Sequence, residues 1–120
     1  MKTVAFRVDA GDRIGLGHAM RCLALADALR ARGAQTAFAS AVMPEKTAAL
    51  LRARGHAVLP LAGAAESSRG EPGGELDAAA QRADATATQR ALAAIASLDW
   101  IVVDHYRLGI DWERGASRFA

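Results

Sequence analysis

Residues 4–32 read VAFRVDAGDRIGLGHAMRCLALADALRAR, and the order of patterns in this stretch decides the fold. Apolar residues alternate with small or polar ones over residues 4–9, which is typical of a β-strand of about five or six residues. Apolar residues then recur three and four positions apart over residues 20–29, which indicates an amphipathic helix that Gly33 ends. The stretch therefore predicts a strand, a glycine-rich loop and a helix, in that order.

The loop between this strand and this helix contains Gly11, Gly15 and Gly17, and His18 follows it directly. Glycine lets the chain turn sharply and lets a ligand approach the main chain closely. The free N–H groups at the start of the helix lie at the carboxyl edge of the sheet, where open α/β folds bind ligands. At the first turn of that helix the dipole favours the uncharged imidazole, so His18 is a candidate general base at neutral pH.

The loop does not match the dinucleotide-binding fingerprint. Met20 stands where that fingerprint needs its third glycine, and residues 41–43 offer no acidic side chain for a ribose hydroxyl. An ordinary nicotinamide-binding site is therefore not indicated, and we expect no cofactor.

The next part of the chain alternates between strand and helix patterns. We expect a strand over residues 35–41 and a helix over residues 44–54. A short strand follows over residues 57–61, and its Pro60 places it at the edge of the sheet because proline cannot donate a ladder hydrogen bond. Glycines, serines and a proline then predict an irregular surface loop over residues 63–75.

The last third of the chain predicts one more strand between helices. Asp84 is the expected N-cap of a helix that extends to about Ser97, and residues 76–82 are a further helical candidate. Residues 99–104 form a β-branched run without alternation, which predicts a strand buried on both faces. A short helix is expected around Trp112. Strands separated by helices at this interval indicate an α/β domain with a parallel, Rossmann-like sheet.

Polar residues follow two of the expected strands. His18 comes after the first strand, and His105 and Tyr106 come directly after the strand at residues 99–104. Because the strands of a parallel sheet end at the same edge, we expect these two polar clusters to converge there.

The composition limits the possible functions. A length of 120 residues allows one domain with one core, and 52% of the residues are hydrophobic and 5% aromatic. The 15 basic and 13 acidic residues are interspersed and leave a net charge of +2, which argues against a nucleic-acid-binding face. No stretch approaches the ~18 apolar residues of a membrane span, and no signal peptide precedes the first strand. The single cysteine excludes an internal disulfide, so we expect a cytoplasmic protein.

Several side chains also have purely structural interpretations. Cys22 lies beside the apolar face of its helix and is expected in the core. His56 has no partner in the sequence and is expected to be solvated; with the histidines so far apart, no metal site is expected. Asp104 and His105 are alternatively a strand-end cap and a surface histidine, and Arg21 is alternatively a solvated charge.

Two segments resemble a known enzyme family. FRVDAGDRIGLGHAMRCLALADAL at residues 6–29 and DWIVVDHYRLGIDWE at residues 99–113 resemble the UDP-2,4-diacetamido-2,4,6-trideoxy-β-L-altropyranose hydrolases of pseudaminic acid biosynthesis. Residues 2–114 can be aligned with the N-terminal half of that family. The resemblance implies a two-domain fold of the GT-B type, in which residues 1–120 are an incomplete, Rossmann-like, sugar-side domain. It also implies a UDP-sugar substrate and a UDP-binding C-terminal domain that is absent from this chain.

The resemblance assigns roles to individual residues. The family's catalytic histidine falls on His18 and its active-site tyrosine falls on Tyr106. Arg107 and Gly109 depart from the Y-G-L-D pattern that is common after the tyrosine. The remaining matches are expected to bind the substrate or to shape its cleft, and they are Asp9, Gly15, Gly17, Arg21, Asp104 and His105.

The resemblance implies hydrolysis at the anomeric carbon, with His18 activating water and Asp104 or Asp9 orienting a neighbouring group. Two alternatives remain open. One is a glycosyltransferase of the same fold, in which an acceptor hydroxyl replaces water. The other is an inactive, truncated module that only binds a nucleotide sugar.

Overall fold

One parallel sheet organises the chain. The computed structural model describes residues 2–11, 15–61, 76–95, 97–105 and 107–116. In this part of the chain four strands pair in the order β3-β2-β1-β4, and every pair is parallel. Their bounds are β1 Thr3–Val8, β2 Gln35–Ser40, β3 Ala57–Pro60 and β4 Trp100–Asp104. The predicted loop at residues 63–75 and Tyr106 lie outside the described residues.

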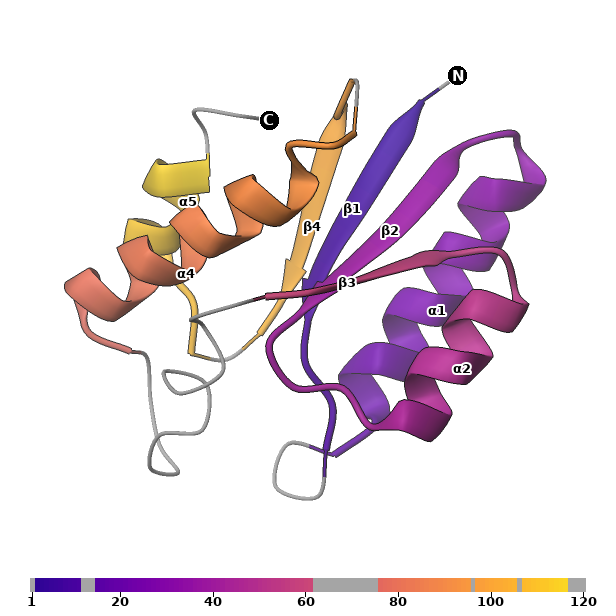
Figure 1. Cartoon of the computed structure of the whole chain (residues 1–120), viewed down its shortest axis with the longest axis horizontal. Helices are drawn as coiled ribbons and strands as arrows, with labels where there is room; N and C mark the ends of the chain where they lie inside the picture. The colour runs from indigo at the N-terminus through magenta and orange to yellow at the C-terminus, as the bar shows by residue number, and fades with distance from the viewer. Residues whose placement is uncertain (1, 12–14, 62–75, 96, 106, 117–120) are drawn as a thin grey trace.

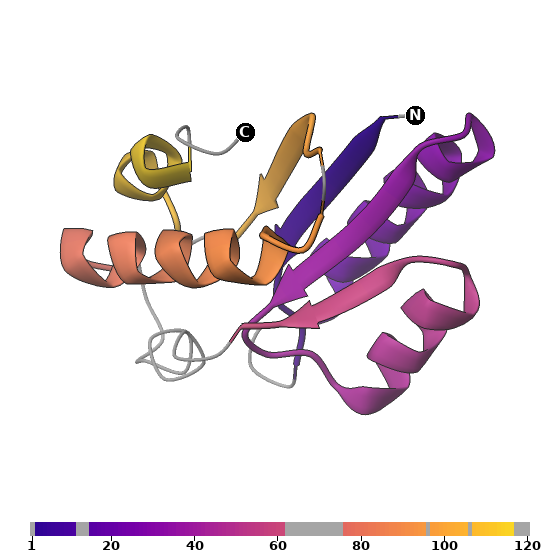
Figure 2. The ribbon, with the colours of Figure 1, turned by 45° about the horizontal axis from the view of Figure 1, so that its top comes forward.

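Helices cover both faces of the sheet, so the predicted α/β fold is confirmed. The helices are α1 Gly17–Ala31, α2 Glu45–Ala53, α4 Ala78–Leu92 and α5 Ile110–Ala116. Helices α1 and α2 lie against one face, and α4 and α5 lie against the other (Figure 1). The arrows of all four strands point the same way, so their carboxyl ends gather at one edge (Figure 2).

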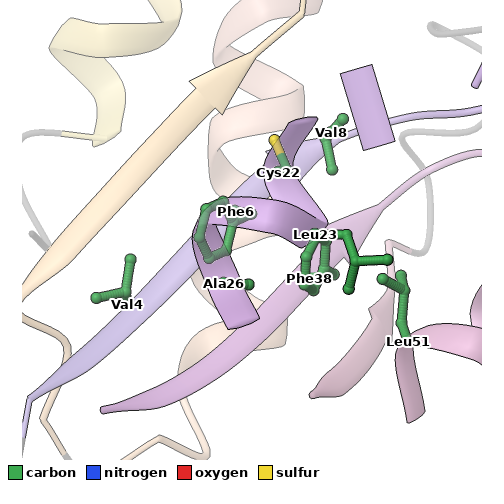
Figure 3. Close-up of a cluster of buried hydrophobic side chains, with 8 residues drawn as sticks. All are labelled: Val4, Phe6, Val8, Cys22, Leu23, Ala26, Phe38 and Leu51. Atoms are coloured by element: carbon green, nitrogen blue, oxygen red, sulfur yellow. The ribbon is translucent and has the colours of Figure 1, made fainter. Parts of the chain in front are cut away.

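The face toward α1 and α2 is a conventional apolar core. Phe6 of β1 stacks on Phe38 of β2, with ring centroids 4.9 Å apart and planes inclined by 15°. Leu23 of α1 and Leu51 of α2 pack against them (Figure 3). The alternation that predicted β1 therefore identifies the residues that face α1 and α2. Because successive side chains of a strand point to opposite faces, the intervening residues of β1 face α4.

The face toward α4 carries a buried charge. The side chain of Arg7 is 0% exposed, and its Nε and Nη2 donate to the two carboxylate oxygens of Asp84 at 2.8 and 2.6 Å. Its Nη1 donates to Asp9 at 2.7 Å. Burial alone would lower the pKa of Arg7, but the hydrogen bond to Asp84 and the charges of both carboxylates hold it above its ordinary value. Arg7 therefore stays charged inside the protein and joins β1, one of the two inner strands, to α4.

The N-cap predicted at Asp84 is wrong, whereas the helical candidate at residues 76–82 is confirmed from Ala78 onward. Asp77 caps the helix, because its Oδ1 accepts a hydrogen bond from the N–H of Ala80 at 2.8 Å. Asp84 lies inside the helix, and the helix ends at Leu92 rather than near Ser97. The alanines that follow Asp77 favour helix strongly, so the helix starts about two turns before the predicted cap.

The predicted burial of β4 is also wrong. Residues 101–104 are only half-buried and Trp100 is 67% exposed, because β4 lies at the edge of the described sheet. A β-branched run indicates a strand, but it does not give the number of neighbours that the strand has. Strand β3 forms the opposite edge, as Pro60 predicted.

Asp84 inside α4 and the N-cap Asp77 allow a matched stability test. We expect Asp84→Ala to lower the free energy of unfolding by about 3–5 kcal/mol, because it leaves a buried guanidinium without its main partner. The same change at the exposed cap, Asp77→Ala, should cost only about 1 kcal/mol. Urea denaturation followed by circular dichroism measures both values. Equal losses for the two variants would contradict a structural role for the buried pair.

Candidate functional site

The sheet order creates a switch point at its carboxyl edge. The chain leaves β1 for β2 and β3 on one side, and it later returns to place β4 on the other side. In open α/β sheets ligands bind in the crevice at such a reversal. Val8 and Asp104 are paired at the ends of β1 and β4, so the loop into α1 and the residues after β4 meet at this place.

The loop after β1 is closed at its base by backbone hydrogen bonds. Gly15 donates to the carbonyl oxygen of Gly11 at 2.6 Å, and Gly11 donates to that of Gly15 at 3.3 Å. Gly15 has a φ of +83°, which strains any residue with a side chain. Gly17 is different, because a Cβ there would contact only an atom of Arg21 at 4.0 Å. The loop conformation thus requires glycine at position 15 but not at position 17.

At the start of α1, His18 faces the last residue of β4. Its Nδ1 lies 2.5 Å from Oδ1 of Asp104, and only 7% of His18 is exposed. Nη2 of Arg21 lies 2.9 Å from the same ring nitrogen and 3.1 Å from Oδ2 of Asp104. A carboxylate can only accept hydrogen bonds, so we assign the proton to Nδ1, which donates it to Asp104. The basic lone pair is then on Nε2.

Cys22 also contacts this carboxylate. Its Sγ lies 3.9 Å from Oδ2 of Asp104, and the residue is buried as predicted. Burial, with a further contribution from the charge of Asp104, raises the pKa of Cys22 to about 11. The thiol is therefore a weak nucleophile at neutral pH.

A second cluster of polar groups is centred on Asp9, which is buried. Nε2 of His105 donates to Asp9 at 2.9 Å, and the backbone N–H of Ala41 does so at 2.8 Å. Nδ1 of His105 accepts from the N–H of Arg107 at 3.1 Å. Burial would raise the pKa of Asp9, but the hydrogen bond from His105 and the charge of Arg7 hold it well below its usual range. Asp9 therefore ties together the ends of β1, β2 and β4.

The predicted site residues thus separate into two groups. The structure brings His18, Arg21 and Asp104 together at the switch point. Asp9 and His105 bond to each other in the interior, with side chains 0% and 6% exposed. The assignment of Tyr106 stays a prediction.

The prediction that His56 is solvated is wrong. Only 3% of the residue is exposed, and its Nε2 lies 2.8 Å from Oδ1 of Asp27. Its Nδ1 lies 2.5 Å from the hydroxyl of Thr36, and its ring meets Phe38 edge-on. A hydrogen bond from His56 lowers the pKa of Asp27. These partners come from α1 and β2, so no local sequence signal could identify them.

Within the described ranges, no group of three or more His, Cys, Asp or Glu side chains is arranged to hold a metal ion. None of the described helices has the length and apolar character needed to cross a membrane.

Comparisons with protein-family models, with curated proteins and with solved structures each find no match to this chain.

The raised pKa of Cys22 gives a test of this geometry. We expect iodoacetamide to alkylate the folded protein at pH 8 at least about a hundredfold more slowly than the urea-unfolded chain, because an unfolded thiol has a pKa of about 8.5. The contribution of the protonated thiol to stability is present below about pH 8.5 and is lost as the pH rises toward 11.

The variant Asp104→Asn removes the negative charge beside Cys22 and should speed alkylation of the folded chain at pH 9. The same change at Asp111 on α5 serves as the control and should have no effect. If folded and unfolded chains react at equal rates, the packing of Cys22 against Asp104 is wrong.

Proposed function

We propose that this chain is the sugar-side half of a UDP-sugar hydrolase of the GT-B type, with His18 as the general base. The substrate that the resemblance implies is UDP-2,4-diacetamido-2,4,6-trideoxy-β-L-altropyranose, and the products are UDP and the free sugar. The observation that carries the proposal is the contact between His18 and Asp104 at the switch point, beside the loop that Gly15 shapes.

The proposed reaction is a displacement by water at the anomeric carbon. The water oxygen forms a bond to that carbon while the bond between the carbon and the phosphate oxygen of UDP breaks. The electron pair of the broken bond leaves with UDP. Nε2 of His18 takes the proton from the water. UDP is a good leaving group once its charge is neutralised, so activation of water is the main task left to this domain. A base on the face opposite the leaving group, one water away from the anomeric carbon, gives inversion.

Asp104 has two tasks in this proposal. It accepts the Nδ1 proton and so directs Nε2 to the water, and its negative charge stabilises the imidazolium that forms when His18 takes the second proton. The arrangement is that of a histidine base oriented by a carboxylate. Tyr106, by the resemblance alone, contacts the substrate or the water. The UDP moiety is assigned to the C-terminal domain on the same basis.

A glycosyltransferase would use the same base on an acceptor hydroxyl. Release of UDP without any acceptor distinguishes the hydrolase from this alternative. Failure to release UDP under any condition favours the binding module. Each assay is made with this chain alone and with the UDP-binding half of a hydrolase of the resembled family added.

The role of His18 is tested by substitution. We expect His18→Gln to lower the rate of UDP release by at least about a hundredfold, because general-base assistance contributes about 10² to 10⁴ in rate. Circular dichroism should show the fold unchanged. His56→Gln is the matched control, since His56 lies before β3 at the opposite edge of the sheet. It should lower stability but keep the rate per folded molecule. A nearly normal rate in His18→Gln would remove His18 from the mechanism.

A further inference from the structure

Three groups from the first turns of α1 hold one carboxylate at the end of β4. Nδ1 of His18, Nη2 of Arg21 and Sγ of Cys22 all approach Asp104, at 2.5, 3.1 and 3.9 Å. Arg21 is one turn beyond His18 on the helix, so the two side chains lie on the same face. The side chain of Arg21 is 65% exposed, yet its Nη2 turns back to the carboxylate instead of extending into solvent.

We infer that Arg21 is a positioning residue, which acts through Asp104 to fix the proton of His18 on Nδ1. The inference rests on the proposed function, because it explains how the base presents Nε2 to water. It differs from the role that the resemblance implies, in which Arg21 binds the substrate.

The physical reason lies in the freedom of an aspartate side chain. A carboxylate can rotate about the bond that joins it to its own chain, and only some orientations place an oxygen on Nδ1 of His18. Nη2 of Arg21 contacts both oxygens of Asp104, at 3.1 and 3.3 Å, from the helix that carries the histidine. The charged hydrogen bonds restrict the rotation, so Oδ1 stays on the ring nitrogen. Without Arg21 the two tautomers of His18 become closer in energy.

The distances also oppose the other possible arrangement. Arg21 could instead donate to Nδ1 itself, from 2.9 Å, which would put the ring proton on Nε2. The lone pair of Nδ1 would then face Oδ1 of Asp104 at 2.5 Å without a proton between them, and two acceptors at that distance repel. The proton on Nδ1 removes this repulsion, and Arg21 is left to bind the carboxylate.

Nitrogen-15 NMR of the histidine rings tests the inference on this chain without any substrate. At pH 8.5, long-range proton–nitrogen spectra show which ring nitrogen of His18 carries the proton. We expect Nδ1 in the parent protein and a substantial population with Nε2 protonated in Arg21→Gln. Arg21→Lys should restore the parent tautomer at least in part, because Arg21 contacts Asp104 through one charged nitrogen, Nη2, which an ammonium can replace. Arg82→Gln, on exposed α4 surface, is the matched control and should change nothing.

Two results would overturn the inference. One is a parent protein with the His18 proton on Nε2, and the other is an Arg21→Gln variant with the parent tautomer. Both are independent of turnover, so absence of UDP release would remove the hydrolase proposal and leave the tautomer result intact.

Where UDP release is measured, a positioning role and a substrate-binding role predict different kinetics. We expect Arg21→Gln to lower kcat about tenfold or more with little change in KM, as loss of a partner that orients a functional side chain does. A raised KM with kcat unchanged would instead make Arg21 a substrate ligand and would contradict the inference.

Discussion

The fold depends on a guanidinium held inside the protein between two carboxylates. Arg7 lies in β1, an inner strand of the sheet, and its charge is tolerated there because Asp9 and Asp84 accept its hydrogen bonds. An apolar side chain at this position could pack against α4 in several ways. The planar fork of arginine matches both carboxylates in few arrangements, so the ion pair sets how α4 lies across the sheet as well as holding it there.

The same network extends to the candidate site. Asp9 accepts hydrogen bonds from Arg7, from the backbone of Ala41 and from His105, so it joins the ends of three strands. His105 directly follows Asp104, and the strand end that offers Asp104 to His18 is therefore held from within the protein. Satisfied polar networks of this kind specify one geometry more strictly than apolar packing does, although their burial costs stability. The contact between His18 and Asp104 thus depends on the buried charges of Arg7 and Asp9.

The sequence predicts those features that depend on local pattern or on topology. Alternation located β1 and β2, short apolar or β-branched runs located β3 and β4, and helical periodicity located α1. Parallel topology placed His18 and Asp104 at the same edge of the sheet. Topology could not decide whether Asp104 or Asp9 contacts His18, because both carboxylates lie at the ends of neighbouring strands. The prediction of Asp84 as a helix cap likewise failed because its real contact is not local. Its partner, Arg7, is 77 residues away in the chain, and no local pattern reports such a contact.

The position of β4 at the sheet edge has a consequence for the durability of the site. Elements with a single strand neighbour open at lower free energy than the centre of a sheet, and such partial opening does not require the whole domain to unfold. Asp104 belongs to this outer strand, whereas His18 belongs to a helix packed on the core. Local opening of β4 alone would therefore separate Asp104 from His18 while β1, β2 and β3 stay paired, so the contact at the site can be lost without unfolding of the domain.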